Sequence, residues 1–106
     1  MSLLINHQSD GQFAVEGDLT FTTIGAGLTK LFAFLDTAQH ITVDFSKVNL
    51  VDSAALALLI EWRKYASQQK VQLVFKNIPK QLFMLAQLSG LNLTSHFTIQ
   101  PATQKV

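Results

Sequence analysis

The segment from residue 41 to residue 75 constrains the fold more than any other part of this chain. Hydrophobic and polar residues alternate over residues 41–45 and again over residues 71–75, which is typical of half-buried β-strands. Between them a continuous apolar run, residues 54–60, lies inside a predicted helix that ends at about Gln69. Two strands joined through a single helix are typical of a parallel crossover. The sequence therefore predicts an α/β fold in which one small sheet packs against its helices.

The segments on either side extend this pattern. Candidate strands at residues 3–6 and 12–16 flank a small polar turn, so they predict a hairpin that makes the sheet mixed. Apolar residues at spacings of three and four predict a helix over residues 20–35. Pro79 is expected to open a third helix that ends near residues 89–90.

Length and composition indicate a single domain. The chain has 106 residues, of which 48% are hydrophobic and 14% charged, so it can bury a core and does not resemble a disordered chain. A last short strand is predicted through Phe97 and Ile99, followed by a polar tail. We therefore expect one domain over residues 1–106, with a core at about residues 3–99 and a tail at residues 100–106.

Charge and composition also argue against several functions. Lys and Arg number 8 against 7 Asp and Glu, and the basic residues are scattered, so electrostatic binding to nucleic acid is not expected. Without cysteine the chain has no thiolate nucleophile and no cysteine-bound zinc. We expect no signal peptide, because residues 1–7 have no basic region and only a short apolar run, and no membrane span, because the longest apolar run is far shorter than ~20 residues. The sequence predicts a soluble, non-exported protein that does not insert into a membrane.

The titratable residues form no recognisable catalytic or metal-binding motif. His7, His40 and His96 lie far apart in sequence, outside any spacing that would align imidazoles on a metal ion. The acidic residues occur singly, so no neighbouring pair suggests a general acid and base. We therefore expect no catalytic residue, no metal and no cofactor.

The pair Asp52-Ser53 stands where a strand leads into the long apolar helix. Its polar side chains lie beside the first backbone N–H groups, where the positive end of the helix dipole also lies. One interpretation is that Asp52 or Ser53 only caps the helix, a contribution of ~1 kcal/mol. The other is that this end binds a phosphate or an acceptor group of a partner.

The same helix carries more apolar surface than one neighbour can cover. Its apolar positions sweep an arc of about 220°, whereas a helix with one buried side needs about 100° or somewhat more. Leu58, Trp62 and Tyr65 would then line an outer edge that faces a partner, since aromatic residues are enriched at interfaces. Alternatively, Trp62 and Tyr65 cover the edge of the core near the third helix.

Four short motifs, in this order along the chain, resemble the STAS domain, the fold shared by anti-sigma factor antagonists and the cytoplasmic tails of sulfate transporters. They are Glu16-Gly17-Asp18-Leu19, Val43-Asp44-Phe45, Val51-Asp52-Ser53 with Leu56 and Leu59, and Leu88-Ser89-Gly90-Leu91. The resemblance covers the chain from Phe13 to about Phe97 and implies a STAS α/β fold with a small mixed sheet.

Two branches of the family offer different functions. In anti-sigma factor antagonists the motif resembles Asp-Ser-Ser-Gly-Leu, and the serine after the aspartate, here Ser53, is phosphorylated by a partner kinase. This chain has Ala54 and Ala55 at the next two positions. The other branch is the small STAS subunit of the phospholipid-trafficking ABC transporter that maintains lipid asymmetry in Gram-negative bacteria. It has Asp-Thr, two small residues and then Leu-Ala-Leu-Leu; residues 56–59 match that run, and Ser53 stands at the threonine position.

This second resemblance implies a non-catalytic cytoplasmic subunit that binds the transporter's ATPase and is peripheral to the inner membrane through that complex. The alternative partner is an anti-sigma factor kinase. The residues we expect to bind the partner are Asp52, Ser53, Ala54, Leu58, Trp62 and Tyr65.

Overall fold

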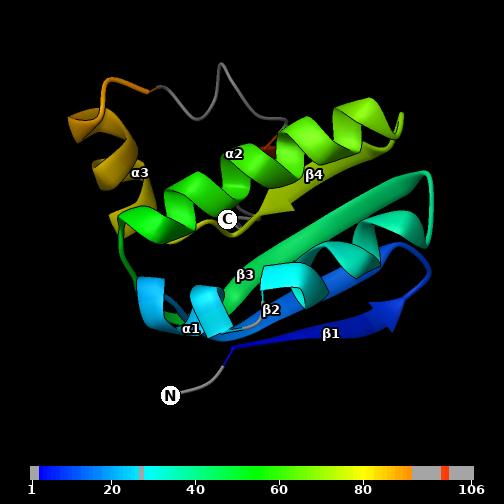
Figure 1. The fold of residues 1–106 in the computed structure, drawn as a ribbon, viewed down its shortest axis with the longest axis horizontal. Helices are drawn as coiled ribbons and strands as arrows, with labels where there is room; N and C mark the ends of the chain where they lie inside the picture. The colour runs from blue at the N-terminus through cyan, green and yellow to red at the C-terminus, as the bar shows by residue number, and fades with distance from the viewer. Residues whose placement is uncertain (1–2, 27, 92–98, 101–106) are drawn as a thin grey trace, which may run out of the picture.

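The computed structural model describes residues 3–26, 28–91 and 99–100 (Figure 1). The elements in chain order are β1 (Leu3–Ser9), β2 (Gln12–Leu19), α1 (Phe21–Ala26), the 3-10 helix η1 (Leu28–Asp36), β3 (His40–Val51), α2 (Ser53–Gln68), β4 (Gln72–Lys76), α3 (Lys80–Leu88) and β5 (Ile99–Gln100).

The five strands form one mixed sheet in the order β1-β2-β3-β4-β5. β1 and β2 are antiparallel, and every other neighbouring pair is parallel, which confirms the predicted hairpin and crossovers. Gly11 makes the hairpin turn at φ +70, and a Cβ there would clash with the carbonyl oxygen of His40. Its own carbonyl accepts the Thr42 N–H at 2.8 Å, so the turn is joined to the start of β3.

The helices α1, η1 and α2 lie on the near side of the sheet in Figure 1, and α3 lies beside the first half of α2. Between the sheet and this layer is an aromatic core. The ring of Trp62 meets Phe34 edge-on with centroids 5.2 Å apart, and Phe45 meets Phe75 edge-on at 5.5 Å. The ring of Trp62 also lies 6.4 Å from each of these two rings, so it joins α2 to η1 on one side and to β3 and β4 on the other.

Three elements differ from the sequence prediction. The helix expected over residues 20–35 is divided into α1 and η1, at a place where Gly25 and Gly27 each lower helix propensity by ~1 kcal/mol. The strand expected over residues 41–45 runs on to Val51, because β3 stays paired with β2 over that length. Gln100, expected in the polar tail, lies in β5 and pairs with Lys76 of β4.

Some predictions fall on residues that the structure does not describe. Phe97 lies outside the described residues, and so do residues 101–106 of the predicted tail. The extent of a single domain over the whole chain stays a prediction. Among the described residues no helix is both long and apolar enough to cross a membrane.

Candidate docking site

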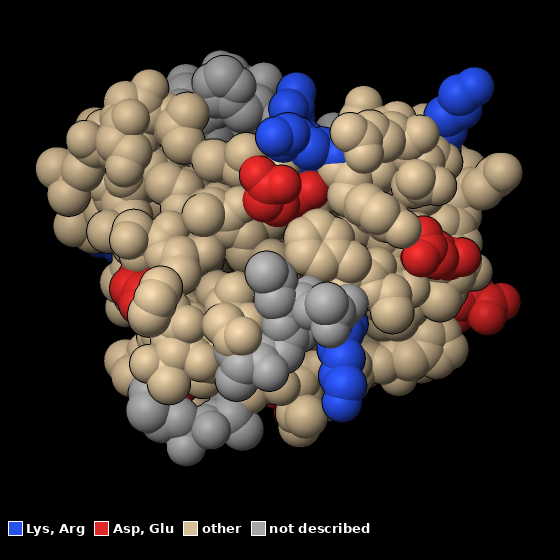
Figure 2. Space-filling view, viewed as in Figure 1, with Lys and Arg blue, Asp and Glu red and all other residues tan. Residues whose placement is uncertain are grey.

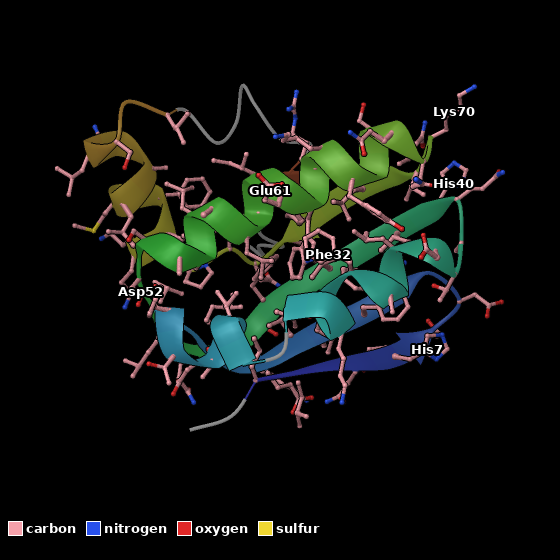
Figure 3. The ribbon with its side chains drawn as sticks, viewed as in Figure 1. His7, Phe32, His40, Asp52, Glu61 and Lys70 are labelled. Carbon is pink, nitrogen blue, oxygen red and sulfur yellow. The ribbon has the colours of Figure 1, made fainter. Side chains whose placement is uncertain are left out.

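The start of α2 is built around the carboxylate of Asp52. This residue is the N-cap, with extended backbone angles (φ −137, ψ −170), and its Oδ1 accepts the Ala54 N–H at 2.9 Å. Its Oδ2 accepts the Phe21 N–H at 3.0 Å, across 31 residues of sequence. The predicted helix start is confirmed, and the capping side chain is Asp52. One carboxylate therefore holds the first turns of α1 and α2 together (Figure 3).

Threonines fix the start of α1 on the other side of this junction. The Thr23 hydroxyl donates to the Asp18 carbonyl at 2.7 Å and accepts the Thr20 N–H at 3.0 Å. The Thr20 carbonyl then accepts the Ile24 N–H, which closes the first turn. These bonds fix the start of α1, where the Phe21 N–H donates to Asp52.

Ser53 is the first residue of α2 and is exposed. Its hydroxyl makes no hydrogen bond to another described residue, so it is not the cap. Ala54 beside it is half-buried, and the Phe21 side chain is 79% exposed. We call Phe21, Asp52, Ser53 and Ala54 the docking end: an unengaged hydroxyl and an exposed aromatic ring next to a carboxylate that both helices hold in place.

The outer edge predicted for Leu58 and Trp62 is wrong, because both side chains are buried. The Trp62 indole N–H donates to the Leu31 carbonyl at 2.8 Å, and its ring packs against Phe34. The wide apolar arc has a structural cause. The helix α2 covers the sheet and is flanked by α1 and η1 on one side and by α3 on the other. Trp62 therefore covers core, as the alternative interpretation expected, and its ring contacts are with Phe34 of η1, Phe45 of β3 and Phe75 of β4.

Tyr65 is half-buried one turn further along α2. Its ring lies edge-on to Phe32 at 5.6 Å, and its hydroxyl donates to Asp36 Oδ1 at 2.8 Å. This hydrogen bond is the main reason why the pKa of Tyr65 is raised above its ordinary value. Tyr65 thus ties η1 to α2, a contact between residues 29 apart that sequence spacing does not reveal.

Charged groups are dispersed over the molecule. On the face seen in Figure 2 the acidic and basic side chains are scattered among uncharged ones. Within the described residues no three His, Cys, Asp or Glu side chains come together to hold a metal ion, and His96 lies outside those residues. The docking end is set apart by its combination of an unengaged hydroxyl, an exposed aromatic ring and a fixed carboxylate.

Comparison with solved structures finds the same fold in several bacterial regulators. The Bacillus cell fate determinant SpoIIAA in its phosphorylated form is 14% identical, with a TM-score of 0.67 over 96% of this chain and 92% of that chain. A candidate anti-sigma factor antagonist of Thermotoga maritima is 14% identical, with a TM-score of 0.71 over 96% and 86% of the two chains. For a variant of RsbS from Moorella thermoacetica the values are 17%, 0.62, 92% and 86%. At these identities the likeness concerns the fold alone.

Sequence comparison gives the family. No curated protein matches the chain in sequence. A family model described as "Mlab, STAS domain" matches residues 5–98, nearly the full length. With the sheet order and helix layer described above, this match means that the chain belongs to the STAS domain family.

Proposed function

We propose that this chain is a non-catalytic, protein-binding subunit that docks through the docking end onto the ATPase of a phospholipid-trafficking ABC transporter. The observation that carries the proposal is the unengaged Ser53 hydroxyl beside the doubly bonded Asp52 carboxylate. A partner can bond that hydroxyl without breaking any contact of the fold. Asp52 keeps the surface preorganised, which lowers the ordering cost of binding.

The apolar part of the docking end is Phe21. Its ring is 79% exposed although its N–H is fixed by Asp52, so it offers a rigid aromatic anchor to a partner surface. Aromatic anchors of this kind supply much of the binding energy of protein interfaces. In this proposal Leu58, Trp62 and Tyr65 support the site from within the fold by holding α2 against η1.

Two features favour the transporter ATPase as the partner. The family model that matches is described by the MlaB name, and the small residues Ala54 and Ala55 precede the Leu-Ala-Leu-Leu run of that branch. The subunit would then work on the cytoplasmic side of the inner membrane, held there by its complex. No cofactor is needed, because the ATPase supplies the chemistry.

A second candidate is an anti-sigma factor antagonist that a kinase switches by phosphorylating Ser53. The exposed Ser53 hydroxyl favours it, since a phosphate there would lie by the first N–H groups of α2. One of the similar folds was solved in a phosphorylated form. Ala54 and Ala55 speak against it, because the antagonist motif has Ser and Gly at those positions.

Affinity purification of the tagged chain from native extract tests the proposal. We expect the ATPase and permease of one transporter, and a kinase with its sigma factor would instead support the second candidate. Ser53→Asp should stay folded and lose the ATPase, since a second carboxylate would be buried beside Asp52. Ser53→Thr should keep the ATPase.

Ser67→Asp is the matched control, because Ser67 is an exposed serine of the same helix near its other end. It should bind like the parent. If Ser53→Asp binds as well as the parent, the docking end is not the partner surface, and the proposal is wrong.

A further inference from the structure

The strand β3 extends beyond the neighbour on one of its sides. On the β2 side its pairing continues as far as Val51, opposite Leu19. On the β4 side its pairing stops at Asp44, opposite Lys76. Residues 46–51 therefore have a side that pairs with no other described strand. We call this side the free β3 edge.

A specific contact lies at the fork, the point where β3 and β4 stop pairing. Asn77 adopts a positive φ of 59 and turns the chain away from β3 directly after β4. Its side-chain N–H donates to Asp44 Oδ1 at 3.0 Å, and the same oxygen accepts the Ser46 N–H at 2.9 Å. The free edge is therefore fixed by the fold and is not a frayed end.

The charge state of Asp44 agrees with this arrangement. Partial burial alone would raise the pKa of Asp44, but the hydrogen bonds from Asn77 and Ser46, together with the charge of Lys76, outweigh it and hold the pKa below its ordinary value. The carboxylate is therefore ionised at neutral pH and keeps both N–H groups at the fork.

Side chains along the free β3 edge are exposed and accessible to a binding partner. Ser46, Lys47 and Asn49 are exposed, and the Leu50 side chain is 57% exposed. An unpaired strand edge offers a row of backbone donors and acceptors to any extended chain. The edge contains no proline and ends at Val51, immediately before Asp52 of the docking end.

Other features keep this edge from pairing indiscriminately. Relative to β2, β3 has one extra residue between Asp44 and Lys47 and another between Val48 and Val51, so it is bulged twice. Bulges and a lysine on a strand edge disfavour nonspecific edge-to-edge pairing between sheets of different molecules. A segment tethered to a partner already seated on the docking end would have a high effective concentration and could still pair.

We propose that the free β3 edge takes an extended segment of the docked partner as an added strand. This inference rests on the proposed function and adds how the partner is held. The segment is proline-free and carries an aliphatic side chain that covers Leu50. Lys47, the one charged side chain on the edge, is paired with Glu16 of β2 at 3.8 Å, so it is not needed to bind the segment. Backbone pairing supplies affinity, and the contact with Leu50 supplies register.

Amide hydrogen exchange of the isotope-labelled chain, free and with the purified ATPase, tests this. The Asp52 N–H points to Leu19 of β2, and consecutive N–H groups of an extended strand point to opposite sides, so the Val51 N–H faces the free edge. We expect exchange at Val51 to slow by tenfold or more in the complex. If the ATPase binds but protects only the first turn of α2, the added strand is wrong and the proposed function stands.

Two further outcomes are decisive. If the ATPase does not bind, the proposed function fails first. If Val51 becomes protected without the ATPase as protein concentration rises, the occupant is a second copy of this chain, which overturns a partner segment.

A pair of leucine variants gives an independent measurement. Leu50→Lys removes the aliphatic contact from the edge and should weaken ATPase binding at least fivefold without shifting the unfolding midpoint. Leu4→Lys is the matched control, because Leu4 is 54% exposed on β1, at the opposite edge of the sheet. It should bind like the parent. Unchanged binding by Leu50→Lys would refute the added strand.

Discussion

The first turn of α2 and its middle turns have similar small and apolar residues, yet they have opposite surroundings. Ser53 is exposed and its hydroxyl is unengaged, whereas Leu58 and Trp62 are buried in the core, where Trp62 packs against η1 and the sheet. From sequence both regions were expected to face a partner. The difference teaches that a wide apolar arc reports how many neighbours a helix has, and not whether one of them is another protein.

The largest effect is expected where the middle of α2 meets the core. Trp62→Ala should destabilise the protein by ~3–5 kcal/mol, because it removes a buried ring and the hydrogen bond to Leu31. Urea unfolding followed by circular dichroism measures this, since the variant lacks the single tryptophan of the chain. Trp62→Phe should cost less, because the ring volume is largely kept. An unchanged midpoint for Trp62→Ala would put Trp62 back on the surface.

A smaller effect is expected at the junction of the two helices. Asp52→Ala leaves the Ala54 and Phe21 N–H groups without their acceptor. Loss of a cap costs about 0.5–2 kcal/mol, and loss of the second hydrogen bond adds about 1 kcal/mol. Fluorescence of Trp62 during urea unfolding measures the sum. Asp52→Asn keeps one acceptor oxygen and should lie between the parent and Asp52→Ala, and equal stability of all three would contradict a shared cap.

Tyr65 gives a test of the contact between η1 and α2 that does not depend on unfolding. It is the only tyrosine, so the tyrosinate absorbance titrates this residue alone. The midpoint should lie above the ordinary value of about 10, because the neutral hydroxyl donates to Asp36. Asp36→Ala should bring the midpoint back down. A midpoint that is the same in both proteins would contradict the contact.

The sign of the linked stability follows from that shift. Because the folded state raises the pKa of Tyr65, the stability from this contact is fully present below pH about 10 and is lost as the pH rises through the higher folded value. Asp36→Ala should abolish this part of the pH dependence.

The sequence predicted well what local pattern determines. The alternation at residues 41–45, the apolar run after Asp52 and the proline at the start of α3 each mark an element by its own residues. Position in a pattern was also enough to predict that α2 begins at Asp52-Ser53.

What depends on distant partners could not be predicted. The extension of β3 to Val51 comes from pairing with β2, and no alternation marks it. The bonds from Asp52 to Phe21 and from Trp62 to Leu31 each join residues 31 apart. The spacing of residues along a helix gives the face on which a side chain lies, but tertiary packing decides whether that face meets core or solvent.

The smallest effect on folding is expected at Ser53. Its hydroxyl makes no hydrogen bond to another described residue, and alanine is a good helix former, so Ser53→Ala should change stability by less than about 0.5 kcal/mol. If Ser53 shared the capping role, the variant would lose about 1 kcal/mol, as a lost cap does. Urea unfolding of Ser53→Ala beside Asp52→Ala separates the two cases on one helix end. With a partner in hand, the same Ser53→Ala protein should bind more weakly than the parent although it is equally stable, because the hydroxyl is then missing only from the interface.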